Sequence, residues 1–83
     1  MNSAYKEKSD RAFSLHEQGK LDEAESIYKE LLSQAPNDIN VLNLYGMLCI
    51  ATKNYNKAIE LLSSAVVLKS NAYVMTNLAK AYF

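Results

Sequence analysis

The sequence predicts an all-α fold of stacked antiparallel helix pairs, with about five helices in a single domain over residues 1–83. Three observations support this prediction. Apolar residues recur at the three- and four-residue spacing of buried helix faces. One proline and two glycines are too few for a chain dense in turns, such as an all-β sandwich. The chain also matches itself when shifted by 34 residues, a period typical of stacked supersecondary units.

The first unit, about residues 5–38, is predicted to contain two helices. A helix over about 5–18 places Ala12 and Leu15, and more weakly Tyr5 and the stem of Lys8, on one face. Gly19 then supplies a left-handed cap. A second helix over about 21–34 carries a buried stripe formed by Leu21, Ala24, Ile27, Tyr28, Leu31 and Leu32. Pro36 ends this helix, and Asn37 or Asp38 is expected to cap the next one.

The second unit, about residues 39–71, repeats this plan. Its first helix, about 39–52, is apolar nearly all round, which requires neighbours on more than one side. A turn at 53–54 follows, in which Asn54 can take a left-handed conformation in place of glycine. The second helix covers about 55–68. Ser70 and Asn71 are expected to cap a fifth helix in a partial third unit, residues 72–83, which matches the second unit at a shift of 33.

Small residues recur at matching places in the units. Ala12, Gly46 and Ala79 are predicted where the first helix of a pair approaches the second closely. Ala24 and Ala58 are predicted where the second helix packs on the next unit. Glycine in mid-helix costs roughly 1 kcal/mol relative to alanine. Close packing is therefore the expected reason for Gly46.

At these positions the chain resembles the tetratricopeptide repeat family. The resemblance covers almost the whole chain and implies a right-handed solenoid segment. The matching residues are Ala12, Leu15, Gly19, Ala24, Tyr28 and Pro36 in the first unit, Leu42, Tyr45, Gly46, Cys49, Ala58, Leu62 and Ala65 in the second, and Met75, Leu78, Ala79 and Tyr82 in the third. The departures are Ser70 for proline, Lys53 for glycine, and the charged Lys8 and Arg11. These two charges indicate solvent on the outer side of the first helix and hence the start of an array.

Composition limits the possible partners. Nine basic and nine acidic residues give a formal net charge of zero, which argues against a nucleic-acid partner. Residues 1–38 nevertheless carry a net −3 and residues 39–83 a net +3. This asymmetry fits ordinary solvated helix faces or head-to-tail attraction between copies. A single cysteine excludes an internal disulfide, and no apolar run is long enough for a signal peptide or a membrane span. A cytoplasmic protein without membrane attachment is expected.

The sequence shows no pattern that predicts catalysis. His16 and Cys49 lie on different predicted helices, and neither has the third group that a catalytic arrangement needs. Cys49 is expected to be a buried core residue, and His16 a surface residue near a helix end. No ligand cluster for a metal and no glycine-rich phosphate loop is present. We therefore expect no enzymatic activity, cofactor or metal.

The resemblance implies a concave groove, formed by the first helices of successive units, that binds a protein or peptide partner. The groove positions implied by the family register are Lys6, Ser9, Asp10, Phe13, His16, Glu17, Asn40, Asn43, Leu44, Met47, Ile50, Tyr73, Thr76, Asn77, Lys80 and Phe83. Nine of them are predicted to bind the partner, namely Asp10, Phe13, Glu17, Asn40, Asn43, Met47, Thr76, Asn77 and Lys80. Met47, with Leu44 and Ile50, fits equally well as packing between helices. Where the family's carboxylate-binding repeats carry lysine, asparagine and arginine, this chain has Ser9, Phe13, Leu44, Tyr73 and Asn77. Recognition of a terminal carboxylate by that arrangement is disfavoured.

The partial third unit predicts an assembly role. Terminal units of a repeat array usually carry a polar outer face, but the last predicted helix does not. We expect self-association, as a two-fold dimer, through Met75, Leu78, Tyr82 and Phe83. The alternative is that the chain continues into a longer repeat array or a larger enzyme, such as a glycosyltransferase, for which these repeats would recruit substrate.

Overall fold

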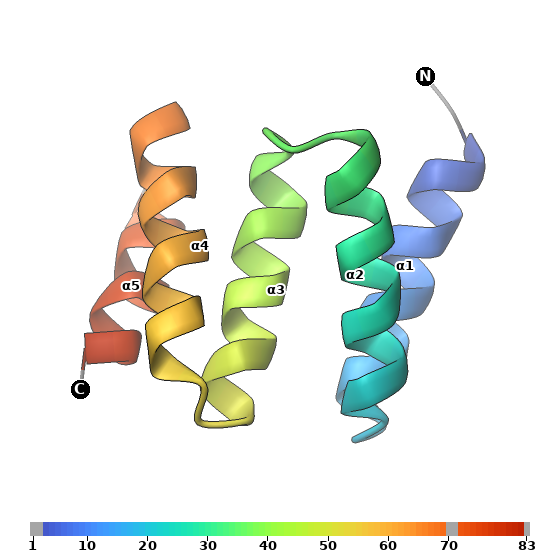
Figure 1. The fold of residues 1–83 in the computed structure, drawn as a ribbon, viewed down its shortest axis with the longest axis horizontal. Coiled ribbons are helices and arrows are strands. Elements are labelled where there is room, and N and C mark those ends of the chain that lie inside the picture. Colours follow the sequence, from blue (N-terminus) through green and yellow to red (C-terminus); the bar gives the residue numbers. More distant parts are fainter. Residues whose placement is uncertain (1–2, 70–71, 83) are drawn as a thin grey trace.

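The computed structural model describes residues 3–69 and 72–82, and within these residues every regular element is a helix (Figure 1). The five helices are α1 (Ser3–Glu17), α2 (Leu21–Gln34), α3 (Ile39–Ala51), α4 (Tyr55–Leu68) and α5 (Ala72–Tyr82). The predicted all-α class is confirmed. The bounds of α2 and α4 agree with the predicted ones, whereas α3 ends one residue early because Thr52 forms its C-cap.

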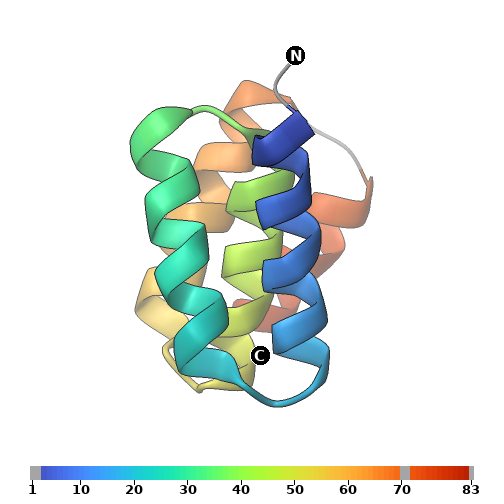
Figure 2. The same ribbon diagram turned by 90° about the vertical axis from the view of Figure 1, so that its right-hand side faces the viewer.

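The helices form two antiparallel pairs followed by a fifth helix. α1 packs on α2, α3 packs on α4, and α5 packs on both α4 and α3. α2 and α4 lie on one side of the molecule, α1 and α5 lie on the other, and α3 lies between them (Figure 2). Since successive helices alternate in direction, α1, α3 and α5 run the same way (Figure 1). This arrangement brings the first helices of successive units side by side, with α3 next to both α1 and α5.

Two turns have the same hydrogen-bond pattern despite different residues. After α1, the amide of Gly19 donates to the carbonyl of His16 and the amide of Lys20 donates to that of Leu15. After α3, the amides of Lys53 and Asn54 donate to the carbonyls of Ile50 and Cys49 in the same way.

The two turns also share one backbone conformation, a left-handed residue that follows the helix. Gly19 is confirmed in that role with φ 82°. The prediction that Asn54 takes it was wrong, because Lys53 has φ 62° while Asn54 has φ −88°. The hydrogen-bond pattern of the turn determines which residue is left-handed. Lysine therefore occupies a position where glycine would carry less backbone strain.

The side chain of Asp38 begins α3. Its Oδ1 accepts a hydrogen bond from the amide of Val41 at 3.2 Å, and its Oδ2 accepts one from the Tyr5 hydroxyl at 2.6 Å. Of the two predicted capping residues, Asp38 therefore fills the role. The second bond ties the start of α3 to α1. The predicted cap of α5 at Ser70 and Asn71 lies outside the described residues.

The centre of the core is α3, which is buried on several sides as its composition predicts. Seven of its residues are buried, namely Val41, Leu42, Asn43, Tyr45, Gly46, Leu48 and Cys49. A Cβ atom built on Gly46 would lie 2.6 Å from Cγ of Leu62 in α4, which confirms the close approach predicted there. Ala12 is fully buried as well. Ala79 is exposed, contrary to expectation, because the described residues contain no second helix that packs on this side of α5.

Side chains on the α2 and α4 side connect the two helix pairs. The Tyr45 hydroxyl of α3 donates to Glu25 of α2 at 2.8 Å, and its ring stacks on Tyr28 with 5.8 Å between centroids. The ammonium of Lys57 in α4 lies 5.3 Å from the centroid of the same ring. Burial, followed by the hydrogen bond to Glu25, raises the pKa of Tyr45 well above its usual value. Tyr45 thus links three helices.

The outer side of the first unit is polar. Lys8 and Arg11 are both exposed, and Lys8 pairs with Glu30 of α2 at 2.6 Å. This confirms that the charged residues of α1 face solvent. No helix of the described part of the chain is long and apolar enough to cross a membrane.

Candidate functional site

The nine residues predicted for the groove lie on α1, α3 and α5, three on each helix. Five of them line two pockets, one between α1 and α3 and the other between α3 and α5. Because the three helices are parallel and adjacent, the pockets lie on successive seams of one layer of the molecule. Asp10 and Asn40 line the first pocket, and Met47, Asn77 and Lys80 line the second.

The pocket between α1 and α3 has a volume of about 210 Å³ and is lined by residues that carry polar groups. Its lining residues are Tyr5, Lys6, Ser9, Asp10, Asp38 and Asn40. Asp10 pairs with Lys6 at 3.4 Å on an exposed surface, where such pairs are weak. Burial, together with the bond to Asp38, raises the pKa of Tyr5 to about 12, so its hydroxyl stays a donor at neutral pH.

The pocket between α3 and α5 has a volume of about 190 Å³ and combines apolar walls with one charge. Met47, Ile50 and Ala51 of α3 face Asn77 and Lys80 of α5 across it. Lys80 is exposed and forms no ion pair with any residue that the structure describes. Met47 and Ile50 are both half-buried, and Ile50 packs against the core while presenting part of its surface to the pocket.

A buried amide pair joins α3 and α5 beside the second pocket. Asn77 Nδ2 donates to Asn43 Oδ1 at 2.9 Å, and the two residues are only 4 % and 5 % exposed. Most of each amide is therefore engaged within the protein. Asn77 still lines the second pocket, whereas Asn43 lines neither. We interpret Asn43 as a residue that fixes the position of Asn77.

The remaining predicted residues lie outside the two pockets. Phe13 is 36 % exposed and meets His16 edge-on with 6.3 Å between ring centroids. Glu17 and Thr76 are exposed. His16 is half-buried rather than a surface residue as expected, since its ring packs edge-on against Phe13. Its Nδ1 is buried with no hydrogen-bond partner among the described residues.

Sequence reasoning missed three residues that line the pockets. Tyr5 was assigned to the packing face of the first helix, Asp38 to a capping role, and Ala51 to no role. Each assignment describes a local property of the residue's own helix. Whether a residue lines a pocket also depends on the neighbouring unit. Tyr5 and Asp38 are separated by 33 positions in the sequence, so local spacing does not predict that their side chains meet.

A third pocket lies on another part of the surface. It has a volume of about 350 Å³ and is lined by Asn37, Ser63, Ser64, Val67 and Leu68, from the turn before α3 and from α4. Val67 is 86 % exposed. No residue of this pocket belongs to the predicted groove, so it offers a matched surface for control substitutions.

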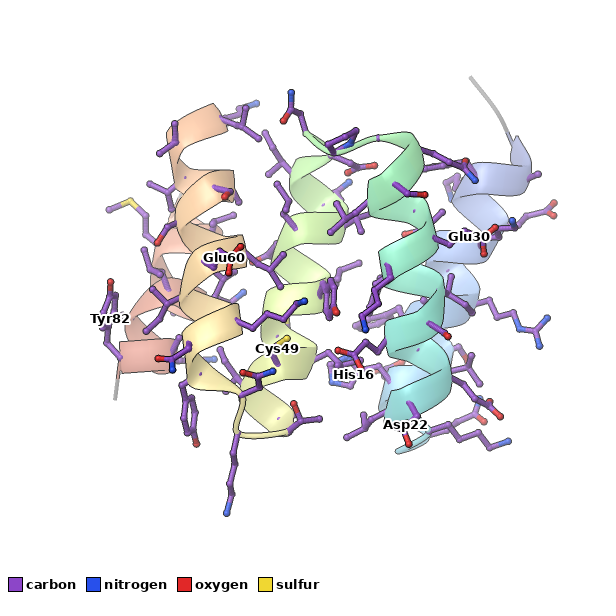
Figure 3. The ribbon with its side chains drawn as sticks, in the orientation of Figure 1. His16, Asp22, Glu30, Cys49, Glu60 and Tyr82 are labelled. Atoms are coloured by element: carbon purple, nitrogen blue, oxygen red, sulfur yellow. The ribbon has the colours of Figure 1, made fainter. Side chains whose placement is uncertain are left out.

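The side chains with the most reactive potential, those of His16 and Cys49, do not form an accessible reactive site. His16 and Cys49 lie on different helices (Figure 3). Cys49 is 1 % exposed, and burial raises the pKa of its thiol to about 11, which leaves it protonated at neutral pH. Its predicted burial is confirmed. Within residues 3–69 and 72–82, no group of three or more His, Cys, Asp or Glu side chains is placed to hold a metal ion.

A family model described as tetratricopeptide repeat matches residues 15–74, which is more than half of the chain. The matched segment begins inside α1 and ends inside α5. No curated protein matches the chain.

Proposed function

The chain belongs to the tetratricopeptide repeat family, whose members generally mediate protein–protein interaction, and from this we propose that it is a non-catalytic module that binds an extended segment of a partner protein. The proposed site is the groove across α1, α3 and α5. The supporting observation is the pair of pockets on adjacent seams of this layer, because a segment crossing α3 would contact both.

The groove has the composition expected of an adaptable binding surface. Half-buried Met47 supplies a flexible apolar contact, and Asp10, Asn40 and Lys80 supply polar contacts around it. Phe13 adds a partly exposed aromatic side chain on α1. Such mixtures of apolar anchors and polar surroundings are typical of protein interfaces.

The proposal is tested by selecting binders from a library of random peptides and measuring their affinities by fluorescence polarisation. Met47→Glu places a charge in the apolar pocket and should weaken binding at least about fivefold, since buried anchors commonly contribute more than about 1 kcal/mol. Val67→Glu is the matched control, because Val67 is exposed on α4 outside the groove. Circular dichroism checks that both variants fold. Equal affinities for the wild type and Met47→Glu would refute the groove assignment.

A second candidate function is self-association through α5. Met75 is 51 % exposed and Tyr82 65 % exposed, and Tyr82 lies at the outer edge of the molecule (Figure 3). Leu78 is half-buried beside them, while Phe83 lies outside the described residues. An exposed surface of adjacent apolar side chains, such as this one on α5, is a common site of contact between chains. The observation supports a homodimer in which this face of α5 is covered.

Sedimentation velocity at micromolar concentration tests the dimer. We expect the wild type to sediment as a dimer and the double variant Met75→Glu/Tyr82→Glu to sediment as a monomer. Val67→Glu again serves as the control, since it alters an exposed apolar residue of α4 and should leave the dimer intact. A monomeric wild type would count against this candidate. Recruitment of substrate by a larger enzyme stays a prediction of the sequence.

A further inference from the structure

We propose that the partner of the groove is an extended peptide with a bipartite charge pattern: a large aliphatic residue beside a carboxylate at one end, and a basic residue about five positions away. This inference rests on the proposed function, since it specifies the chemistry of the segment that the groove binds. It follows from the different linings of the two pockets and from the distance between them.

The pocket between α3 and α5 fits an aliphatic side chain with a neighbouring negative charge. Met47, Ile50 and Ala51 supply carbon surface along α3, and a methionine side chain adapts to different aliphatic shapes. Lys80 lies across the pocket on α5 and has no carboxylate partner among the described residues. A peptide carboxylate next to the aliphatic residue would pair with this ammonium group at the edge of the pocket and select for a negative charge there.

The pocket between α1 and α3 attracts the opposite charge. Asp10 and Asp38 contribute two carboxylates, against the single ammonium of Lys6. Asp38 accepts hydrogen bonds from Tyr5 and from the amide of Val41, which hold the carboxylate in place without neutralising it. The pair between Lys6 and Asp10 is long and exposed, so a basic peptide side chain can compete for Asp10 at little cost.

The length of α3 between the two pockets sets the spacing in the peptide between the aliphatic residue with its carboxylate and the basic residue. Asn40 lines the first pocket, and Met47 and Ile50 line the second. At a rise of 1.5 Å per residue, these positions are roughly 10–15 Å apart along the axis. One pocket lies toward α1 and the other toward α5, which adds up to about one interhelical spacing of roughly 8–10 Å across α3. An extended chain at about 3.3 Å per residue covers the resulting distance in roughly four to six residues.

The buried amide pair beside the second pocket contributes little to the selection of a partner. Asn43 and Asn77 bond to one another rather than projecting into solvent. Among the residues that the structure describes, Lys80 is the one charged residue that lines the second pocket. The charges that discriminate between partners are therefore those of Lys80 at one end and of Asp10 and Asp38 at the other.

The test is a selection of random peptides, long enough to reach both pockets, on wild-type protein and on charge-reversed variants. The wild type should enrich an aliphatic residue next to Asp or Glu, with Lys or Arg four to six positions away. Lys80→Glu should replace the enriched acidic residue by a basic one, and Asp10→Lys should remove the basic preference. Lys69→Glu and Glu7→Lys are matched controls, since they make the same charge changes at exposed residues outside both pockets.

Affinities then separate the inference from the proposed function. A peptide selected on the wild type should bind Lys80→Glu about fivefold to tenfold more weakly, and exchange of its acidic residue for lysine should restore the affinity. An unchanged motif on Lys80→Glu overturns the inference. Peptides that lose affinity for Met47→Glu but show no charge preference also overturn it and leave the groove function standing. Peptides indifferent to Met47→Glu refute the groove function, and the inference with it.

Discussion

At the scale of single residues, Gly46 sets how closely α3 approaches α4. A Cβ atom at this position would lie 2.6 Å from Cγ and 2.7 Å from Cδ2 of Leu62, and Leu62 is fully buried. Distances this short require Leu62 to move inside a packed core. Gly19 differs, since a Cβ atom there meets nothing within 4 Å and the constraint is its φ of 82°. The two glycines are thus needed for different reasons, one for space and one for conformation.

Gly46→Ala should lower the free energy of unfolding by about 1–2 kcal/mol, measured by urea denaturation. Overpacking commonly costs about 1–3 kcal/mol, and the higher helix propensity of alanine offsets up to about 1 kcal/mol of this. In a double-mutant cycle with Leu62→Ala, the two effects should be less than additive, because the smaller side chain makes room for the methyl group. A Gly46→Ala variant more stable than the wild type would contradict the packing explanation.

Cys49 makes stability sensitive to alkaline pH. Burial raises the pKa of its thiol from 9.0 to about 11 in the folded protein. Between these values the unfolded chain has lost the proton while the folded chain keeps it, so the free energy of unfolding falls as pH rises. Tyr28, whose pKa burial raises from 10.0 to about 12, should add a similar loss at higher pH.

The free energy of unfolding should therefore decline from about pH 9 upward, and it can be measured by urea denaturation at a series of pH values. Cys49→Ala removes the thiol from the buried site and should show a smaller decline between pH 9 and 10, below the range in which Tyr28 contributes. Comparison with each variant's own value at pH 7 corrects for packing lost by the substitution. If the free energy of unfolding declined equally with pH in the two proteins, the thiol of Cys49 would not cause the decline.

At the scale of helices, one side chain both starts α3 and attaches it to the preceding unit. Asp38 caps α3 through the amide of Val41 and accepts a hydrogen bond from Tyr5 in α1. The residues preceding α2 and α4, Lys20 and Asn54, make no capping side-chain bond. The cap of α3 is therefore the most informative helix start to change.

Asp38→Ala should lower the free energy of unfolding by about 1–3 kcal/mol, as followed by thermal and urea denaturation. Loss of a side-chain cap typically costs about 0.5–2 kcal/mol, and loss of the second hydrogen bond adds about 1 kcal/mol. Tyr5→Phe removes only the bond between the units and separates the two contributions. If Tyr5→Phe costs as much as Asp38→Ala, the capping bond contributes nothing.

The turns show how position within a repeat can override residue type. Lys53 adopts φ 62° because the amides of Lys53 and Asn54 bond back to the last turn of α3. The same pattern after α1 uses Gly19, for which a positive φ carries no penalty from a Cβ atom. Alignment of the two units places Lys53 opposite Gly19, so the repeat register predicts the left-handed residue better than the preference of asparagine does.

At the scale of the molecule, stability should decrease from the centre of the stack to α5. α3 contacts the helices of both units, whereas α5 contacts only α3 and α4. Val74, Asn77 and Ala81 are buried on one face of α5, and Met75 and Tyr82 are exposed on another. In a stacked array each helix is stabilised by its neighbours, so a helix covered on one side opens more easily.

Hydrogen exchange followed by mass spectrometry should therefore show the slowest amide exchange in α3 and the fastest helical exchange in α5. Measurement at low concentration, where any dimer dissociates, gives the protection of the single chain. If self-association covers α5, raising the concentration should slow exchange in α5 selectively. The Met75→Glu/Tyr82→Glu variant is the control and should show no such change. Equal protection of α3 and α5 in the dilute protein would contradict the proposed gradient.

The sequence alone determined the all-α class, the repeat and most helix bounds. These properties depend on local spacing: the apolar stripe of α2, the breaks at Gly19 and Pro36, and the small residues at matching positions are all readable within one unit. The burial of Cys49 followed from the apolar surroundings in its own helix. Five of the nine groove residues predicted from the family register line the two pockets.

The tertiary structure decided the features that depend on contacts between units. The bond between Asn43 and Asn77 joins residues 34 positions apart, and Asn43 lines neither pocket although it was predicted for the groove. Asp38 and Tyr5 form one wall of a pocket although each was assigned a role within its own unit. Ala79 is exposed although its counterpart Gly46 is buried, because burial depends on which helix lies opposite. Spacing along a chain records which face of a helix is apolar, but only the packed structure shows what that face meets.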